Sequence, residues 1–406
     1  WKSASSVRRG ARRAMEGALE ILNYRPTMRY RPFGTKTDVL VSMLGFGAMR
    51  LPLTEGRIDV PRAIDVIETG FDGGINYIDT AYAYNDGESE KTVGLALGNG
   101  WRDKVNLATK LPTWIVDRPG QQQALFETQL ARLQAQRIDF YLLHSLNKQY
   151  WKNVLNSRSL EWLDEEKRRG RIRFAGFSFH DDFELFKTIV DAYDWDFCQI
   201  QYNYAQSDVQ AGVRGLKYAS GKGIGVAVME PLFGGFLTGP QMPPGASRLF
   251  EENGLNPVSS ALRWVWNQPE PSVVLSGMGE KYQVKDNLRI VETADAGGLT
   301  EREKLVLEKV CLFIREYVPI ACSKCGYCLK SCPVGVKIPD MFDLYNKHLL
   351  TDRKHALQPA LYKGMLPNEK ASACIRCGEC KRRCPQGLDI PVWLAKVAAE
   401  FEGTKG

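Results

Sequence analysis

Residues 138–144 read Ile-Asp-Phe-Tyr-Leu-Leu-His, an apolar run that closes on an ionisable side chain. Seven more runs rich in β-branched and aromatic residues alternate with amphipathic stretches of about 10 to 15 residues. The eight runs are Val39–Ala48, Tyr77–Ala81, Val105–Leu111, Ile138–His144, Ile172–Phe179, Phe197–Asn203, Ile224–Met229 and Val273–Met278. Alternation of this kind is typical of parallel βαβ units, so the sequence predicts an α/β fold, a (β/α)8 TIM barrel.

A doubly wound open sheet is the alternative arrangement of such units. That fold usually carries a G-x-G-x-x-G turn where its first strand meets a helix. Here the corresponding stretch is Leu44-Gly45-Phe46-Gly47-Ala48-Met49, which lacks the pattern. The barrel is therefore the favoured prediction.

Eight of the ten cysteines form two copies of one spacing near the C-terminal end. Cys322-x2-Cys325-x2-Cys328-x3-Cys332-Pro333 recurs 52 residues later as Cys374-x2-Cys377-x2-Cys380-x3-Cys384-Pro385. Three thiolates two residues apart hold one cubane, and the fourth binds the other cluster in two-cluster ferredoxins. The spacing predicts two 4Fe–4S clusters, the first held by Cys322, Cys325, Cys328 and Cys384 and the second by Cys374, Cys377, Cys380 and Cys332.

Structural zinc and a disulfide framework are the alternatives for these cysteines. Zinc sites usually pair two C-x2-C units without a third cysteine in the series, and disulfide-rich domains are typical of secreted proteins. Apolar residues at helical spacing fill much of the stretch between the two motifs. A small, mainly helical ferredoxin-like domain is therefore expected after the barrel.

Length and charge set the expected organisation. The chain has 406 residues, 44% apolar and 25% charged, which fits a soluble globular protein with two domains. We expect a basic N-terminal extension at 1–27, the barrel at 28–300 and the cluster module at 301–406.

The charge distribution argues against a nucleic-acid partner. The formal charge is +7, but residues 1–31 alone carry +6, so no basic domain for nucleic acid is predicted. No apolar run is long enough for a membrane span.

Four ionisable residues lie where predicted strands end or just beyond. Asp79, Tyr84, Lys110 and His144 belong to the second, third and fourth strand units. Each alone has a structural explanation, as a turn cap, a loop aromatic, a snorkelling lysine or a core histidine. Because catalytic groups of barrel enzymes gather at the carboxyl ends of the strands, together they predict one active site.

Asp79-Thr80-Ala81-x-x-Tyr84, Ala108-Thr109-Lys110 and Tyr141-Leu142-Leu143-His144 resemble the catalytic tetrad of the aldo-keto reductases over roughly residues 28–292. The C-terminal arrangement resembles the subgroup with a ferredoxin-type tail. The resemblance implies nicotinamide-linked hydride transfer between a carbonyl and an alcohol. We expect Tyr84 to donate the proton, Lys110 to lower its pKa, Asp79 to keep Lys110 charged and His144 to orient the carbonyl.

The resemblance also implies nucleotide contacts. These are Gly47, Ala48, Met49, Ser178, Gln199, Met229, Ser276, Gly277, Met278, Gln283 and Asn287. Phe179 replaces an expected Asn, and Met229 stands where many members stack an aromatic ring. Gly277 and Gln283 replace the cations that often bind the 2′-phosphate, with Lys281 or Lys285 as possible substitutes. Both NADPH and NADH therefore remain candidates.

Three functions are compatible with the two halves. In the favoured one, the barrel is an oxidoreductase acting on a small carbonyl or alcohol, and the clusters connect it to a ferredoxin or flavoprotein. In the second, the clusters of a plain carbonyl reductase are structural or redox-sensing. In the third, the barrel has lost nicotinamide chemistry and the protein is an electron-transfer subunit. We expect a cytoplasmic protein, because low-potential clusters suit a reducing compartment.

Overall fold

The computed structural model describes residues 27–239, 242–350 and 358–403. The basic extension expected at 1–27 lies outside the described residues except for Thr27. Eight parallel strands close into a barrel in the order β10-β11-β12-β3-β6-β7-β8-β9. Their bounds are β3 (Leu44–Gly47), β6 (Tyr77–Asp79), β7 (Asn106–Leu111), β8 (Ile138–Leu146), β9 (Ile172–Phe179), β10 (Phe197–Gln201), β11 (Gly225–Met229) and β12 (Pro271–Ser276). The predicted (β/α)8 barrel is confirmed.

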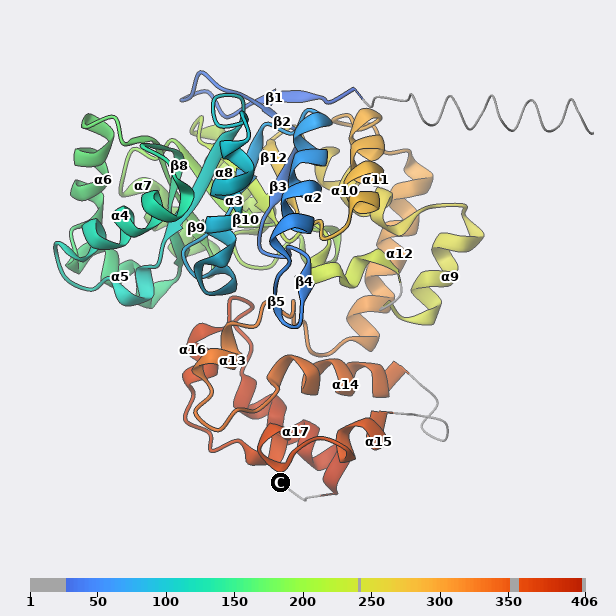
Figure 1. Ribbon diagram of the computed structural model, residues 1–406. Coiled ribbons are helices and arrows are strands. Elements are labelled where there is room, and N and C mark those ends of the chain that lie inside the picture. The colour runs from blue at the N-terminus through green and yellow to red at the C-terminus, as the bar shows by residue number, and fades with distance from the viewer. Residues whose placement is uncertain (1–26, 240–241, 351–357, 404–406) are drawn as a thin grey trace, which may run out of the picture.

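The run expected as one strand at Val39–Ala48 forms two. Its first part, β2 (Leu40–Ser42), pairs antiparallel with β1 (Tyr30–Pro32), and only β3 joins the barrel. The β1–β2 hairpin lies at the end of the barrel opposite the C-terminal module (Figure 1). Phe33, which follows β1, is fully buried and packs edge-on against Phe140 and Phe197 of the barrel interior. The hairpin therefore closes this end of the barrel.

Helices surround the barrel (Figure 1). They are α2 (Val60–Asp72), α3 (Glu88–Gly98), α4 (Gln121–Leu133), α5 (Lys148–Asn156), α6 (Ser159–Arg168), α7 (Phe183–Asp191), α8 (Gly212–Gly221), α9 (Pro244–Glu252), α10 (Pro257–Trp266) and α11 (Lys281–Glu292). Side-chain caps fix several starts, as where Asp59 accepts from the Arg62 amide before α2. Short elements in the loops are β4 (Leu53–Thr54), β5 (Arg57–Ile58), η1 (Tyr84–Gly87), η2 (Thr113–Ile115), η3 (Tyr204–Gln206) and η4 (Phe233–Thr238).

The helix that follows the barrel packs on the barrel side. A capping box of Thr300 and Glu303 starts α12 (Glu301–Tyr317), as its sequence suggests. Val310 and Ile314 of α12 share a core with Leu237 and Phe250. A separate core begins only at Ile320. The division at residue 300 thus stays a proposal, and the packing favours one closer to 319.

The C-terminal module is helical and repeats itself. Its elements are α13 (Tyr327–Ser331), α14 (Ile338–Leu350), α15 (Gln358–Lys363), η5 (Pro367–Glu369), η6 (Ala371–Ala373), α16 (Glu379–Arg383) and α17 (Ile390–Glu402). Gly326 precedes α13 with φ +79°, and Gly378 precedes α16 with φ +78°. The backbone of the two cysteine motifs is therefore the same, as the sequence repeat predicts. Among the described residues, no helix is both long and apolar enough to cross a bilayer.

Candidate active site

The four predicted catalytic residues come together at the carboxyl ends of neighbouring strands. Asp79 ends β6, and Tyr84 begins η1, the next element of the chain. Lys110 and His144 lie near the ends of β7 and β8. Strands β6, β7 and β8 pair in this order in the barrel. Asp79, Lys110 and His144 are buried. The structure therefore assembles the whole set in one place, although the catalytic role of each residue remains a prediction.

Lys110 organises this group with three hydrogen bonds. Its ammonium donates to Asp79 Oδ1 at 2.5 Å, to the Thr80 carbonyl at 2.8 Å and to the Tyr84 hydroxyl oxygen at 3.1 Å. An ammonium has three donors, so all of them are used. Gln199 donates to the other oxygen of Asp79 at 3.0 Å. Burial lowers the pKa of Lys110 and raises that of Asp79, and their mutual attraction opposes both shifts.

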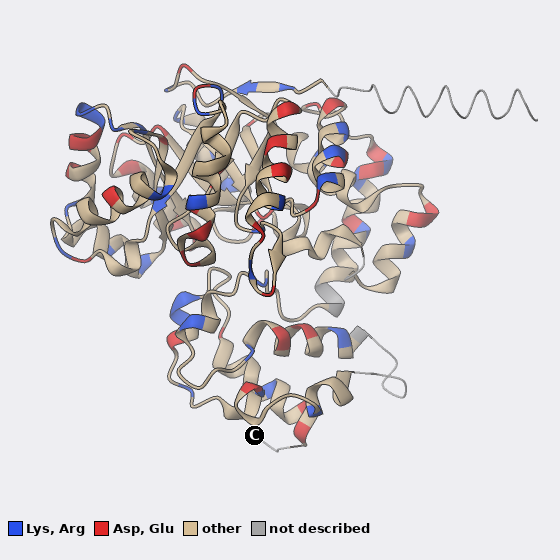
Figure 2. Cartoon of the chain, in the orientation of Figure 1, with Lys and Arg blue, Asp and Glu red and all other residues tan. Residues whose placement is uncertain are grey.

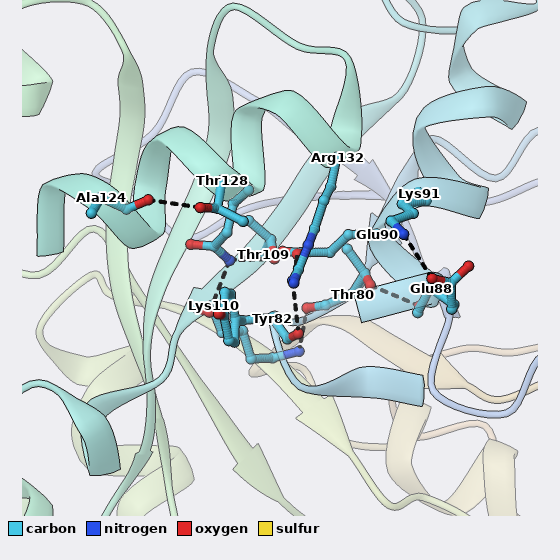
Figure 3. Close-up of polar contacts among 12 residues, drawn as sticks. Thr80, Tyr82, Glu88, Glu90, Lys91, Thr109, Lys110, Ala124, Thr128 and Arg132 are labelled. Carbon is cyan, nitrogen blue, oxygen red and sulfur yellow. Dashed lines mark hydrogen bonds and ion pairs between the residues drawn. The ribbon is translucent and has the colours of Figure 1, made fainter. Parts of the chain in front are cut away.

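A second, fully buried carboxylate supports the strand that carries Lys110. Glu90 of α3 accepts from Thr109 and from Gln129, each at 2.7 Å, and from Arg132 at 3.1 Å. Figure 3 shows Arg132 reaching in from α4 beside Glu90 and the carbonyl of Tyr82. Gln129 also donates to the Lys110 carbonyl at 3.1 Å. These bonds hold the Thr109 side chain and the Lys110 carbonyl, so they support the strand at the point where Lys110 enters the site.

His144 is aimed into the site by an irregularity in its strand. The register between β8 and β9 shifts between Leu143 and Leu146, and Ser145 has a positive φ of 58°. The Nδ1 atom of His144 is buried and has no hydrogen-bond partner in the described part of the chain. Burial, together with the charge of Lys110, holds its pKa well below the usual value, so the ring is neutral. The His144 ring also lines a cavity, where the N–H group of a neutral imidazole can donate to a carbonyl oxygen.

The pKa of Tyr84 differs from the expectation. Burial raises it well above 10, the charges of Asp79 and Glu230 raise it further, and a hydrogen bond from Tyr327 opposes the change. Lys110 donates to the phenol oxygen at 3.1 Å, and its ammonium is 4.6 Å from the ring centroid. The net shift of the Tyr84 pKa is therefore upward, opposite to the lowering expected from Lys110, and the effect of Lys110 itself stays a prediction. Tyr84 is a protonated phenol at neutral pH.

A cavity of about 890 Å³ extends from these residues to α11. It is lined by eight of the eleven predicted nucleotide contacts: Gly47, Met49, Gln199, Met229, Ser276, Gly277, Gln283 and Asn287. Ala48, Ser178 and Met278 are buried and do not line it. The Ser178 hydroxyl instead accepts from the Ser145 amide at 2.7 Å. Phe179, at the altered position, packs against Phe177 and Phe186.

The far end of the cavity offers little charge for a 2′-phosphate. Gln283 accepts from the amides of Gly279 and Glu280 and so caps α11. Lys281 pairs with Asp65 at 2.5 Å, and neither Lys281 nor Lys285 lines the cavity. Arg289 does line it and pairs with Asp286 at 3.0 Å. The expected substitutes for the missing cations therefore do not reach the cavity.

The cysteines gather in the two sets that the spacing predicts. Cys322, Cys325, Cys328 and Cys384 surround one small cavity between the two motifs. Burial raises the pKa of Cys322 to about 11 and of Cys325 to about 12, and the charge of Cys384 contributes to both. Burial likewise raises the pKa of Cys380 to about 11, with contributions from Cys374, Cys332 and Cys377. Each set thus contains three cysteines of one motif and the fourth of the other.

The alternatives for these cysteines fit the geometry less well. All ten cysteines lie in the described part of the chain, and no disulfide joins any of them. Within that part, no three Cys, His, Asp or Glu side chains are placed to hold one metal ion. In a cubane each thiolate binds a different iron, so the sulfurs stand around a cluster and not around one ion. Four cysteines around one shared space are the arrangement that a cubane requires.

The first cysteine motif lies on the catalytic cavity. Ser323, Cys325 and Tyr327 line it together with Tyr84 and His144. Polar contacts hold the module on the barrel: Arg50 donates to the Ser323 carbonyl at 3.1 Å, Gln386 to Gln201 at 2.7 Å and Gln210 to the Pro385 carbonyl at 2.6 Å. Figure 1 shows the module lying across this end of the barrel. The donor set of Cys322, Cys325, Cys328 and Cys384 is therefore next to the active site.

The family model described as Aldo/keto reductase family matches residues 43–295. The chain belongs to the aldo-keto reductase family. A second model, described as a 4Fe-4S dicluster domain, matches residues 321–388. The protein is thus an oxidoreductase of the aldo-keto reductase type with a 4Fe–4S dicluster domain, as its motifs predict.

Known aldo-keto reductases resemble the barrel half. The chain is 27% identical to the NADH-specific methylglyoxal reductase of Escherichia coli (strain K12), over 68% of this chain and 98% of the relative. It is 27% identical to the uncharacterized oxidoreductase YrpG of Bacillus subtilis (strain 168), over 65% of this chain and 91% of the relative. The holo form of aldo-keto reductase AKR11C1 from Bacillus halodurans matches with a TM-score of 0.58 and 26% identity, covering 70% of this chain and 96% of that one.

Sequence reasoning missed several residues that line the cavity of this aldo-keto reductase. Tyr327 lies inside the first cysteine motif, where it counted only as a spacer. Glu230 directly follows Met229 at the carboxyl end of β11, a position that could have drawn attention to it. Its side chain accepts from the Gly234 amide at 2.5 Å and lies 3.9 Å from Arg50. Arg50 belongs to no recognisable sequence motif, because its partners, Ser323 and Glu230, lie in distant parts of the chain.

Proposed function

We propose that this aldo-keto reductase reduces small carbonyl compounds by nicotinamide-linked hydride transfer, and that two 4Fe–4S clusters connect its cavity to an external one-electron carrier. One observation carries the proposal: Cys325 and Tyr327 of the first cysteine motif line the same cavity as Tyr84 and His144. Electron transfer between the first cluster and the cavity gives a reason for this placement. The complete arrangement of Asp79, Tyr84 and Lys110 argues against a barrel that has lost its chemistry.

The cavity fits a nicotinamide dinucleotide in extent and in its donors. It reaches from His144 to Asn287 on α11. Gln199 and Met229 would hold the nicotinamide end, and Ser276 and Asn287, which are hydrogen-bonded to each other at 3.0 Å, the adenosine end. The nucleotide supplies the hydride. Because Lys281 pairs with Asp65 outside the cavity, we propose NADH as the better substrate of the two nucleotides.

Four residues of the chain bind the carbonyl oxygen and supply the proton. His144, which is neutral and lines the cavity, donates its ring N–H to the carbonyl oxygen and orients it. Tyr84 gives its hydroxyl proton to that oxygen as negative charge develops there. Lys110 donates to the Tyr84 oxygen at 3.1 Å and stabilises the phenolate that remains. Asp79 keeps the ammonium of Lys110 charged inside a buried site.

The second cysteine set, Cys374, Cys377, Cys380 and Cys332, is where electrons would pass between the protein and an external carrier. The clusters pass single electrons, which the carrier delivers or removes. Cys377 is exposed, and Ile375, two residues before it, is 64% exposed. Arg376 lies between them, and the neighbouring helix α16 carries Lys381, Arg382 and Arg383, which colour it blue in Figure 2. An apolar contact with a basic rim suits a carrier with an acidic surface, such as a ferredoxin or flavoprotein.

Anaerobic titration tests the proposal. Purified protein with its clusters is titrated with NADH and with NADPH while nucleotide binding and cluster absorbance are followed, and turnover is measured with methylglyoxal as the first carbonyl. We expect nucleotide binding, carbonyl reduction, and reduction of the clusters by NADH alone or with added flavin. Failure of both nucleotides to bind would leave only the electron-transfer subunit. Binding with no change in the clusters, with or without flavin, would leave a plain reductase with structural or sensing clusters.

Two tyrosines of one loop provide matched variants. Tyr84→Phe is expected to abolish carbonyl reduction with the iron content intact, because the proton donor is lost. Tyr82→Phe, two residues earlier, is expected to retain turnover, because its hydroxyl does not line the cavity. Equal turnover in the two variants would show that Tyr84 is not the proton donor.

We further propose that the protein works in a reducing compartment, the cytoplasm, where such clusters persist.

A further inference from the structure

The side chain of Tyr327 enters the catalytic site from the cluster module. It belongs to the first cysteine motif, between Cys325 and Cys328, and starts helix α13. Its ring centroid lies 6.4 Å from that of His144, nearly perpendicular to it. Its hydroxyl group donates a hydrogen bond to the oxygen of Tyr84. A residue of the iron–sulfur module thus touches the proton donor of the barrel.

From this geometry we infer that Tyr327 is a positioning residue for the proton donor Tyr84, so that the catalytic group of the barrel is complete only when the first cysteine motif is in place. The inference rests on the proposed function, since it concerns the proton that carbonyl reduction consumes. In that step a C–H bond of the reduced nucleotide breaks and a C–H bond forms at the carbonyl carbon, so the nucleotide is oxidised and the carbonyl is reduced. The Tyr84 O–H bond breaks, and its proton forms the alcohol O–H bond.

Two donors then converge on the oxygen that keeps the charge. Lys110 approaches the Tyr84 oxygen from inside the barrel at 3.1 Å, and Tyr327 approaches it from the module. Asp79 and Glu230 add negative charge near the same oxygen and therefore oppose phenolate formation. A hydrogen bond to a charged oxygen is worth more than one to a neutral oxygen, so each donor counts most when the proton has left.

The internal repeat separates this role from cluster binding. Tyr327 of the first motif corresponds to Glu379 of the second, because both precede the third cysteine and begin a short helix after a glycine with positive φ. Glu379 forms an ion pair with Arg382 and does not line the catalytic cavity. The motif fold therefore accepts a charged side chain at this position. The hydroxyl group of Tyr327 is therefore needed for its contact with the barrel and not for the fold of the cluster-binding loop.

The barrel fixes the loop that carries Tyr327. Arg50 holds the Ser323 carbonyl at 3.1 Å, and Gln386 holds Gln201 at 2.7 Å and lies 3.4 Å from the Ser323 hydroxyl. These bonds come from both motifs and meet at the same loop. Loss of the iron would release the cysteines that shape this loop and would displace Tyr327. Carbonyl reduction is thereby made dependent on an assembled module, even where no electron passes through it.

The test compares Tyr327→Phe with Glu379→Gln in protein that contains its clusters. We expect Tyr327→Phe to lower kcat for methylglyoxal reduction about tenfold or more. Its solvent deuterium isotope effect should rise, because proton transfer becomes slower. Its iron content, its EPR spectrum and its dissociation constant for NADH, measured by fluorescence, should match the wild type. Glu379→Gln should match the wild type in every measurement.

The outcomes separate this inference from the proposed function. If wild type and Glu379→Gln reduce the carbonyl and Tyr327→Phe keeps kcat within about twofold with an unchanged isotope effect, the inference fails alone. If the wild type shows no nucleotide-dependent reduction of any carbonyl, the proposed function fails. Should Tyr327→Phe lose iron, 3-fluorotyrosine at this position, a stronger donor of nearly the same shape, replaces it. An unchanged isotope effect in that protein would overturn the inference.

Discussion

Replacing Gly234 by alanine should separate the cluster module from the active site. Gly234 lies in η4 with φ +64°, and a Cβ atom there would be 2.2 Å from the Ser323 carbonyl oxygen. Ordinary contacts begin at 3.4 Å, so the first cysteine motif must retreat by about 1 Å. The left-handed backbone lowers the free energy of unfolding of the alanine variant by about 1 kcal/mol, and the clash lowers it by about 1–3 kcal/mol more. A displacement of this size at a catalytic group lowers kcat about 100-fold.

Gly235 supplies the control for this variant. It has φ +90°, and a Cβ atom there meets nothing within 4 Å. Gly235→Ala therefore carries the backbone strain without the clash. Urea unfolding followed by cluster absorbance and circular dichroism should show the larger loss of stability for Gly234→Ala, and methylglyoxal turnover should fall only in that variant. Equal stability and equal turnover of the two proteins would refute the docking of the motif at this position.

Cys325→Ser should lose about half of the iron, whereas Cys311→Ser, outside both motifs, should keep all of it; full iron in the former would refute its assignment as a ligand. The pKa of His180, lowered by burial to about 4, means that the unfolded chain binds a proton below about pH 6.5 and the folded chain does not. Stability should therefore fall as pH drops from about 6.5 towards 4, by up to about 3 kcal/mol, and His180→Gln should flatten this slope in urea titrations. Because burial raises the pKa of Tyr84, carbonyl reduction should keep its rate from about pH 6 to 9 and alcohol oxidation should accelerate with pH; the opposite pair of profiles would contradict a protonated Tyr84.

The sequence suffices for the barrel because each strand has its own apolar run, and for the clusters because ligand spacing is a local property. The strand bounds differ little from the predicted runs, except where Met43 divides the first run between the hairpin and the barrel. The four residues from Asp79 to His144 are also within reach of sequence reasoning, since strand ends meet at one face. What joins these parts depends on contacts between distant segments, such as Arg50 with Ser323, and such contacts leave no pattern.

The pKa of Tyr84 was out of reach for a related reason. Because strand ends meet at one face, sequence reasoning places Lys110 near Tyr84 and suggests that its positive charge stabilises a phenolate. Burial of the loop under the cluster module is visible only in three dimensions, and so is Glu230, which reaches the site from β11. Desolvation is the largest cause of the shift in the Tyr84 pKa, and the nearby ammonium of Lys110 is already paired with Asp79 at 2.5 Å. The direction of the shift is thus set by the fold around the tetrad and not by its members.

A raised pKa suits a site that reduces carbonyl compounds. Hydride arrival at the carbonyl carbon produces an alkoxide, which is a much stronger base than a phenolate, so even a weakly acidic Tyr84 gives up its proton readily. Lys110 and Tyr327 then bind the oxygen that has become charged. In the reverse direction Tyr84 must lose its proton before an alcohol can react, and burial, Asp79 and Glu230 all oppose that loss. The electrostatics around Tyr84 therefore favour reduction, and the cysteine motif that covers the cavity strengthens this preference by excluding water from the phenol.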